Sequence, residues 1–363
     1  MKESLVKRID DFTSIIGVSG HEWDVARYVK KSLEGFVDSI EMMPTGTVIA
    51  RKKGAKPGPT VMYGAHMDEV GYVVKRVSSQ GFLFFDRVGY ATEACLPARP
   101  VLVKGDKEAV KGVIGVRSGH MLTAEQLSHP QTTVQSYVDI GCSSKEEVEA
   151  LGIGPGSQIV PESPLTELNG SGIYVTRAAD CRALCAVLVE AMRSIDAEEL
   201  HGEVCAVFTT LEETALKGAC PPVNYLNPLY SIFLDTIPCG DVPDCDYEGE
   251  LPIALNDGPV IVLSQACLAS DDYACSHPKL VEAARKACEA VGIEHQEISF
   301  NGATYLTDAV TAQTAGNGTA VMSFTLPRRY SHAATEVFSI NDAVDLEKAL
   351  IEFMKMEIDL CMF

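Results

Sequence analysis

The 363-residue sequence is poor in positive charge and in aromatic side chains, and each shortage disfavours a class of protein. Its 30 lysines and arginines stand against 50 aspartates and glutamates, which gives a formal charge of −20. Binding to nucleic acid or to an anionic membrane requires clustered positive charge, so neither is expected as a partner. A single tryptophan also disfavours a carbohydrate site, because such sites favour aromatic platforms.

Long apolar runs and targeting signals are missing as well. No window approaches the roughly 18 uninterrupted apolar residues of a transmembrane helix. The stretch Met1–Asp11 alternates charged with apolar residues and has no apolar core of a signal peptide. The 12 cysteines include no Cys-x-x-Cys pair, which disfavours a zinc ribbon, and a chain of this size needs no disulfides. We therefore expect reduced cysteines and a cytoplasmic protein.

The apolar pattern predicts an α/β protein with an insert. Residues 1–70 contain two helical patterns followed by strand-like runs, and residues 164–363 alternate helix with strand. Residues 71–163 hold short apolar runs separated by glycine, proline and charged turns, as in a small β-barrel or sandwich. The sequence thus predicts a catalytic domain (1–70 and 164–363), built on a mixed sheet covered by helices, and an inserted β-barrel domain (71–163).

Several histidines and acids stand where the predicted strands end. In open α/β sheets ligands bind beyond the carboxyl ends of the strands, so these side chains are expected to meet at one rim. Imidazoles combined with carboxylates form the ligand set that zinc-like divalent metals prefer. Taken singly, each residue also has an ordinary explanation as a helix cap, a turn residue or a surface group. The residues are His66, Asp68, Glu212, Glu213, Asp235 and His332, together with Asp180 at the expected start of a helix, where it can act as the cap.

Two local spacings suggest separate roles within this set. A metal-bound histidine usually donates its other N–H to a carboxylate, and Asp68 in the His66-x-Asp68 spacing suits that role. Glu212 and Glu213 are adjacent, and adjacent residues on an extended segment point in opposite directions. One is therefore expected to bind metal and the other to act as general base, which disfavours the facing carboxylates of a glycosidase. A turn aspartate and a solvated acidic turn are the alternatives.

A series of short motifs runs along nearly the whole chain. They are Gly17-Val18-Ser19-Gly20-His21-Glu22, Gly64-Ala65-His66-Met67-Asp68-Glu69-Val70-Gly71, Tyr137-Val138-Asp139-Ile140-Gly141, Ala179-Asp180-Cys181-Arg182, Glu212-Glu213 with Lys217-Gly218-Ala219, and Arg329-Tyr330-Ser331-His332. Together they resemble peptidase family forty-two (clan MH), the di-metal aminopeptidases. That family includes glutamyl and deblocking aminopeptidases and the tetrahedral TET particles.

The resemblance implies a centre of two divalent metal ions per subunit, with zinc as the first choice and cobalt or manganese as alternatives. Carried over by position, His66 and Glu213 would hold one metal, Asp235 and His332 would hold the other, and Asp180 would bridge the two. The family also implies that the inserted barrel helps subunits to pair. We therefore expect a homo-oligomer, with twelve chains as one arrangement.

The implied activity is that of an aminopeptidase acting on short peptides. The metals would acidify a water, Glu212 would take its proton as the general base, and Asp68 would support the chemistry through His66. The alternatives are a metal amidohydrolase or deacylase acting on small metabolites, a glycosidase of the kind labelled endoglucanase, and an inactive oligomeric homologue.

The chain departs from the family pattern at positions beside the site. It has Cys181 where the family usually has Asn or Asp, Leu211 where Gln is usual, Thr214-Ala215 in place of Val-Gly, and Lys217 in place of Arg. None of these is an implied metal ligand. The departures therefore bear on specificity and rate more than on metal binding.

Overall fold

The computed structural model describes residues 1–123, 129, 131–302 and 305–362. The helices are α1 (Lys2–Ser14), α2 (Trp23–Leu33), α4 (Lys145–Ala150), α5 (Ala179–Ser194), α6 (Cys220–Leu226), α7 (Pro278–Val291), α8 (Ala309–Ala312) and α9 (Ile340–Met354). The strands of the main sheet are β1 (Ser39–Met42), β2 (Val48–Lys53), β3 (Lys56–His66), β10 (Thr166–Leu168), β11 (Ile173–Thr176), β12 (His201–Thr209), β13 (Tyr230–Pro238), β14 (Val260–Cys267), β15 (Asp272–Cys275), β16 (Gln296–Gly302), β17 (Ala320–Arg329) and β18 (Glu336–Ser339).

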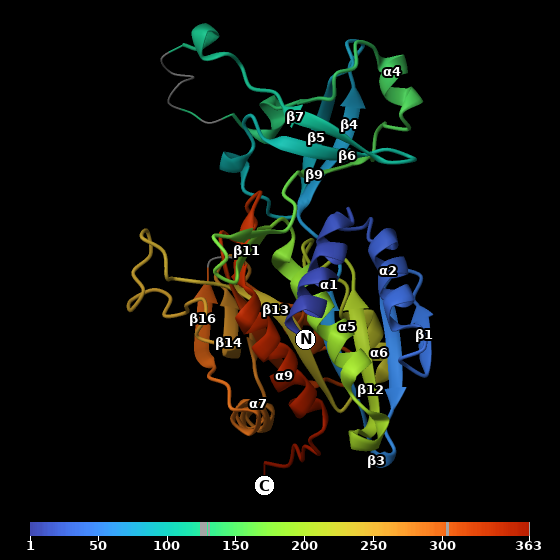
Figure 1. Ribbon diagram of the computed structural model, residues 1–363, viewed down its shortest axis with the longest axis vertical. Coiled ribbons are helices and arrows are strands. Elements are labelled where there is room, and N and C mark those ends of the chain that lie inside the picture. The colour runs from blue at the N-terminus through green and yellow to red at the C-terminus, as the bar shows by residue number, and fades with distance from the viewer. Residues whose placement is uncertain (124–128, 130, 303–304, 363) are drawn as a thin grey trace.

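Among the described residues, this main sheet has 12 strands and is mixed (Figure 1). The order across it is β1-β2-β12-β3-β13-β17-β18-β11-β10, and β14 pairs with β17, β15 and β16 beside this path. Its centre is parallel, because β3 pairs with β12 and β13, and β13 pairs with β17, all in the parallel sense. The predicted mixed α/β sheet with helices is confirmed.

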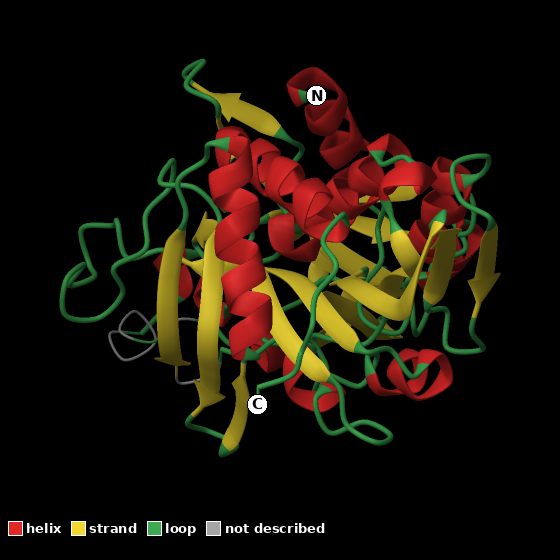
Figure 2. Cartoon of the chain, turned by 90° about the horizontal axis from the view of Figure 1, so that it is seen from below, coloured by secondary structure: helices red, strands yellow, loops and turns green. Residues whose placement is uncertain are grey.

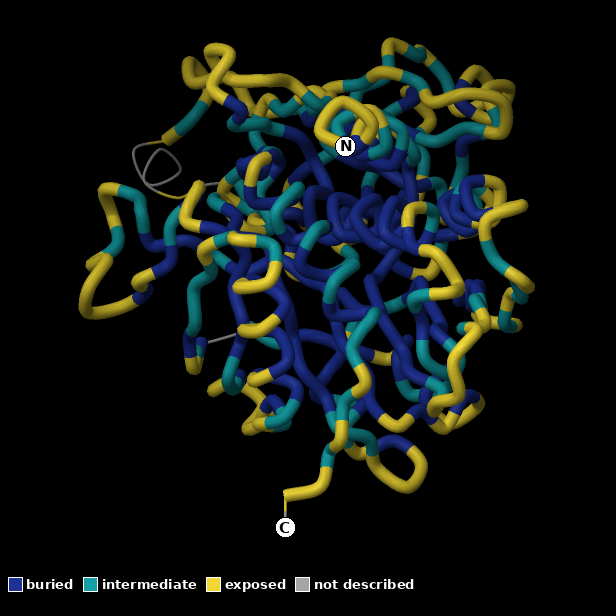
Figure 3. The backbone as a smooth tube through the Cα atoms, turned by 60° about the horizontal axis from the view of Figure 1, so that its bottom comes forward, coloured by how far each residue is buried: buried dark blue, intermediate teal, exposed yellow. Residues whose placement is uncertain are grey.

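Helices cover both faces of the sheet (Figure 2). On one face α1, α2, α5 and α9 pack against Val61, Tyr63 and Ala65 of β3, whereas α6 and α8 pack on the face that carries Met62. Successive side chains of a strand point to opposite faces, so both faces of β3 are buried. Figure 3 shows the consequence, with buried chain through the middle and exposed segments around it. None of the described helices has the length and apolar character that a membrane span requires.

The segment between β3 and β10 forms a second, smaller structure. Its strands are β4 (Gly71–Val77), β5 (Leu83–Val88), β6 (Pro100–Lys104), β7 (Ala109–Ile114), β8 (Val138–Asp139) and β9 (Gln158–Pro161). They close into a barrel in the order β4-β5-β8-β7-β6-β9. The barrel has its own apolar core, which includes Tyr72, Phe85, Val101 and Ile159, and it lies at one end of the molecule in Figure 1. Residues 124–128 and 130 of this segment lie outside the described residues.

Strand register decides which residues meet at the carboxyl edge of the sheet. Thr209 of β12 pairs with His66 of β3, and Phe233 of β13 pairs with Gly64. Continuing the second register by two residues brings Asp235 beside His66. Since β4 starts at Gly71, shortly after His66, the barrel stands over this same edge.

Arg182 of α5 ties the N-terminal segment to that edge. Its side chain is fully buried, and its guanidinium donates to the carbonyl oxygens of Phe12 and Ile15 at 3.0 Å each and of Gly17 at 3.2 Å. It also donates to the carbonyl of Met67. A guanidinium offers five N–H donors in a fixed plane, which lets one side chain join four separate backbone positions.

We predict that Arg182→Met is strongly destabilising. The change leaves buried carbonyl oxygens without donors, and breaking a buried charged network of this kind costs about 3–5 kcal/mol. Urea unfolding followed by circular dichroism measures the loss. Arg27→Met is the matched control, because Arg27 pairs with Asp24 on the surface of α2 and exposed pairs contribute little. Equal unfolding free energies for the two variants would contradict the anchoring role of Arg182.

Candidate metal centre

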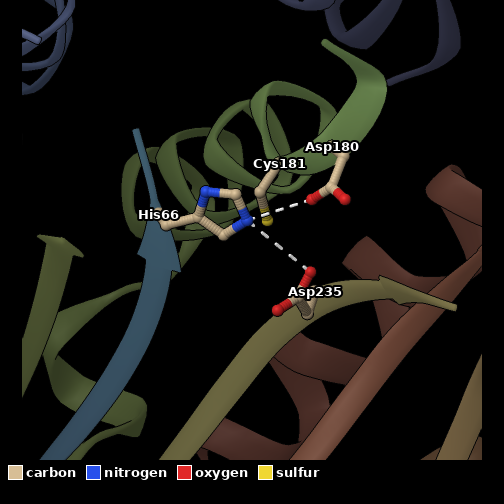
Figure 4. A group of neighbouring side chains, drawn as sticks. All are labelled: His66, Asp180, Cys181 and Asp235. Carbon is tan, nitrogen blue, oxygen red and sulfur yellow. Dashed lines mark hydrogen bonds and ion pairs between the residues drawn. The ribbon is translucent and has the colours of Figure 1, made fainter. Parts of the chain in front are cut away.

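The predicted site residues meet in three groups among the described residues, and two of these groups share Asp180. In the first group, His66 Nε2 lies 3.0 Å from Asp180 Oδ1 and 3.7 Å from Asp235 Oδ1 (Figure 4). In the second group, His332 Nε2 lies 3.4 Å from Asp180 Oδ2 and 3.3 Å from Glu213 Oε2. Within each group the potential ligand atoms lie within 4.8 Å of one another. The two oxygens of Asp180 thus face different partners, as a bridging carboxylate requires.

The family resemblance implies that His66 shares a metal with Glu213 and that Asp235 shares the other with His332. The first pair does fall in one group, together with Glu212. Among the described residues, no group of potential ligands contains both Asp235 and His332. The reason is register: Asp235 falls beside His66 on the neighbouring parallel strand, whereas His332 lies in the turn after β17 and contacts Glu213.

Asp180 is not the helix cap that the sequence suggested. The N-cap of α5 is Ala178, and Asp180 has non-helical backbone angles. Its carboxylate faces the two histidines and Arg328 instead of the first turn of the helix. A cap would have consumed the oxygens that the two groups share.

Asp68 lies directly behind His66. The Nδ1 atom of His66 is 3.2 Å from the backbone oxygen of Asp68 and 3.5 Å from its Oδ1. A proton on Nδ1, donated to these oxygens, leaves the lone pair of Nε2 facing Asp180 and Asp235. This is the tautomer that a metal-binding imidazole needs.

Glu212 and Glu213 lie in a turn and not on an extended segment. Leu211, which precedes them, has a left-handed backbone with φ of 62°. The Asp68 carboxylate accepts the backbone N–H of Glu212 at 3.1 Å and that of Glu213 at 3.0 Å. Both glutamate side chains form one group with His66, within 4.8 Å. The expectation that they point in opposite directions was therefore wrong, because it assumed strand geometry.

The carboxylates of the site are buried close together, and this shifts their proton affinities. Burial, reinforced by neighbouring carboxylates, raises the pKa of Glu212 well above its usual value and that of Glu213 to about 8. Burial also raises the pKa of Asp235. Asp180 behaves oppositely: burial acts to raise its pKa, but Arg328, at 3.0 Å, and the two imidazoles hold it well below the usual range.

The imidazoles respond to the same negative charge. Burial acts to lower the pKa of His332, but the Glu213 and Asp180 carboxylates raise it to about 9. For His66, burial is likewise outweighed, by Cys181, Glu212 and Asp180, and its pKa is well above the usual value. The carboxylates and imidazoles of the centre therefore shift each other's proton affinity.

The donor set fits divalent metal binding. Among the described residues, Glu213 Oε1 is buried without a hydrogen-bond partner. Carboxylates outnumber the cationic groups around the shared Asp180, and the Nε2 atom of His66 has its lone pair free in the tautomer described above. A divalent cation would bind the unpartnered oxygen, offset the excess negative charge and accept the lone pair of Nε2. Imidazole with carboxylate is a ligand mix that zinc-like ions accept.

The centre opens into a cavity of about 860 Å³. Residues of the barrel segment, including Arg87 and Tyr90, line it together with Glu212, His332 and Phe300 of the larger part of the chain. Its size falls within the usual range for small-molecule and cofactor sites. The barrel segment also touches the ligand turn, because the Thr92 N–H donates to the His332 carbonyl at 3.0 Å.

Three further side chains of the centre were not identified from the sequence. Arg328 binds Asp180 and also pairs with Glu336. Glu336 accepts the backbone N–H groups of Asp180 and His332, each at 3.0 Å. Cys181, which appeared only as a departure from the family pattern, points into the first group (Figure 4). Their closeness in sequence to the motif residues was the available signal.

Comparisons with known proteins agree with the motif resemblance. A sequence profile described as M42 glutamyl aminopeptidase matches residues 46–348. The FrvX protein of Escherichia coli (strain K12) is 32% identical over 329 residues, which cover 90% of this chain and 88% of FrvX.

Solved structures extend the similarity to the whole fold. The aminopeptidase APDkam598 from the archaeon Desulfurococcus kamchatkensis is 26% identical with a TM-score of 0.90, over 98% of this chain and 96% of that one. The TET1 peptidase of Pyrococcus horikoshii, which can assemble into a tetrahedron or a large octahedral shell, is 28% identical with a TM-score of 0.82, over 96% and 99% of the two chains. The chain therefore belongs to the M42 family of aminopeptidases and is an exopeptidase.

Proposed function

We propose that the protein removes N-terminal residues from short peptides, using two divalent metal ions per subunit. The observation that carries the proposal is the pair of ligand groups that share Asp180, beside a cavity that also contains Glu212. Zinc is the first candidate, and cobalt or manganese would accept the same ligands.

In this proposal the first group, His66, Asp180 and Asp235, holds one ion, and the second group, Asp180, Glu213 and His332, holds the other. When bound, the ions polarise the scissile carbonyl and lower the pKa of the attacking water. The Arg328 guanidinium keeps Asp180 ionised, which suits a carboxylate that serves both groups.

Glu212 is the proposed general base. It lines the cavity and lies 4.0 Å from His66 Nε2, outside the two groups that share Asp180. Its carboxylate accepts a proton from the attacking water and returns it to the nitrogen of the leaving amine, so the enzyme regains its starting state. Asp68 supports both functions, because it fixes the tautomer of His66 and binds the backbone of the turn that carries Glu212.

A metal amidohydrolase or deacylase would use the same centre on a different substrate. Membership of an aminopeptidase family favours peptides over that alternative, and also over a glycosidase. Hydrolysis of aminoacyl-coumarins compared with N-acetylated aminoacyl-coumarins separates the readings, because an aminopeptidase requires the free α-amino group.

We further propose that residues 71–163 form a domain through which subunits pair, while 1–70 and 164–363 form the catalytic domain. Several apolar residues of the inserted segment are exposed, among them Val116 by 47%, Met121 by 63% and Val134 by 86%. Covering such side chains with a second copy removes apolar surface from water. The TET1 relative forms large shells, and a twelve-chain particle is the assembly proposed for this protein.

We predict that activity depends on divalent metal. Dialysis against a strong chelator should abolish aminoacyl-coumarin hydrolysis, and zinc, cobalt or manganese should restore it. Elemental analysis of the active sample should give two ions per subunit. A metal-free protein with full activity would rule out the proposed mechanism.

We predict that Glu212→Gln and Glu213→Gln fail in different ways. The first variant cannot accept a proton, so its rate should fall by about 10²- to 10⁴-fold while both metals stay bound. The second loses a ligand charge, so it should bind less metal, and added metal should restore part of its rate. The two neighbours are matched in size and burial and act as controls for each other.

Metal content and rate, measured on both glutamate variants, decide these roles. Metal loss in Glu212→Gln with retention in Glu213→Gln would mean that the assignments are exchanged. Near-normal rates in both variants would show that neither glutamate takes part.

We predict that Val134→Asp disrupts the assembly. A buried charge in the proposed subunit contact is unfavourable, so light scattering should show smaller particles than the wild type. Leu229→Asp is the control, because Leu229 is 42% exposed on the larger part of the chain. A wild-type mass of 39.1 kDa, which is that of the single chain, would contradict the proposed assembly.

A further inference from the structure

Two buried carboxylates bind three successive backbone N–H groups in the turn that carries Glu212. Glu22 accepts the N–H of Leu211 at 3.1 Å, and Asp68 accepts those of Glu212 and Glu213 at 3.1 and 3.0 Å. Glu22 is 3% exposed. The turn is thereby fixed to side chains from two other parts of the chain.

The bond from Glu22 falls on the residue whose backbone is least favourable. Leu211 has a φ of 62°, in the left-handed region where a Cβ atom crowds the backbone. The same Glu22 oxygen accepts the N–H of Gly20 at 2.8 Å, where glycine permits a φ of 84°. Glu22 therefore links a glycine bend of the N-terminal segment to the strained residue that precedes Glu212.

We propose that Glu22 is a positioning residue, which holds Leu211 in its left-handed conformation and so directs the Glu212 carboxylate into the cavity. The inference rests on the proposed role of Glu212 as general base. Glu22 lies outside the described residues that line the cavity and outside the ligand groups, so it acts through the backbone. A change in the backbone angles of Leu211 would displace the side chain of Glu212, the next residue in the chain.

The chain offers a closely matched control in Asp342. This carboxylate is 1% exposed, and it accepts the N–H groups of Asn256 at 2.8 Å and Gly258 at 3.1 Å. Asn256 is also left-handed, with a φ of 67°. Asp342 thus also holds a left-handed residue through backbone hydrogen bonds, but it lies outside the described lining of the catalytic cavity. Its replacement therefore measures the loss of stability that follows when such a carboxylate is removed far from the site.

The experiment compares Glu22→Leu, Glu22→Gln and Asp342→Leu in the metal-loaded enzyme, with leucyl-coumarin as substrate. Glu22→Leu should lower kcat about tenfold to a hundredfold, because a displacement of about 1 Å can cost that much, while KM and metal content stay unchanged. Glu22→Gln keeps an acceptor oxygen and should recover most of kcat. Asp342→Leu should lose thermal stability and keep its kcat. If Glu22→Leu does not fold, Glu22→Ala and Asp342→Ala replace the two leucine variants.

Hydrogen–deuterium exchange across residues 210–218 supplies a readout that needs no turnover. Exchange in this turn should accelerate in Glu22→Leu and remain as in the wild type in Asp342→Leu. An unchanged kcat in Glu22→Leu, an equal loss of kcat in Asp342→Leu, or unchanged exchange in the turn would each overturn the inference. A wild type that hydrolyses no aminoacyl-coumarin would overturn the proposed function instead, while the exchange result would still decide the structural role of Glu22.

Discussion

Repulsion among buried carboxylates is the constraint on which the rest of this site depends. Asp180, Glu212, Glu213 and Asp235 are each less than a tenth exposed, with relative exposures of 7%, 8%, 6% and 6%. Charges held this close in a poorly solvated place cannot all remain ionised without compensation. The raised pKa values of Glu212, Glu213 and Asp235 express that conflict. A bound divalent cation would offset this repulsion, which supports the proposed metal site.

Hydrogen bonding separates the carboxylates that hold the structure from those that remain available as ligands. Asp68, Glu22 and Glu336 accept backbone N–H groups, which fixes the segments that carry the site. Glu213 keeps one buried oxygen without a partner among the described residues. A buried polar atom left in this way is costly unless something else binds it. Asp68, Glu22 and Glu336 therefore position the segments of the site, whereas Glu213 keeps an oxygen available for the proposed metal ion.

The barrel segment and the sheet together enclose the catalytic space. The cavity has walls from both, and the Thr92 N–H bonds to the carbonyl of His332, a proposed ligand. A displacement of the barrel segment would therefore move the backbone of His332 and change the shape of the cavity. Contacts between subunits through the barrel segment would in this way influence the position of His332 and the walls of the cavity.

The sequence alone selected the candidate site residues. Local apolar periodicity predicts where strands end, and ligands bind beyond the carboxyl ends of the strands in open α/β sheets. It predicted the mixed α/β sheet covered by helices, and the family. Cys181, Arg328 and Glu336 lie within or close to the motifs, and Arg328 lies near the carboxyl end of β17, but only the structure shows that they belong to the centre.

Tertiary structure decided how the site residues associate. The grouping of His66 with Asp235 depends on the register between β3 and β13, and no local pattern encodes register. The grouping of Glu213 with His332 depends on how the turns after β12 and β17 fold over the edge of the sheet. Asp180 does not cap α5, because its carboxylate contacts partners from two other segments: His66 at the end of β3, and Arg328 with His332 at the end of β17 and in the turn after it. The turn at Glu212 depends on Leu211 being held left-handed by a side chain almost two hundred residues earlier. The sequence predicted an extended segment there, because the hydrogen bond from Glu22 comes from a distant part of the chain that no local pattern reveals.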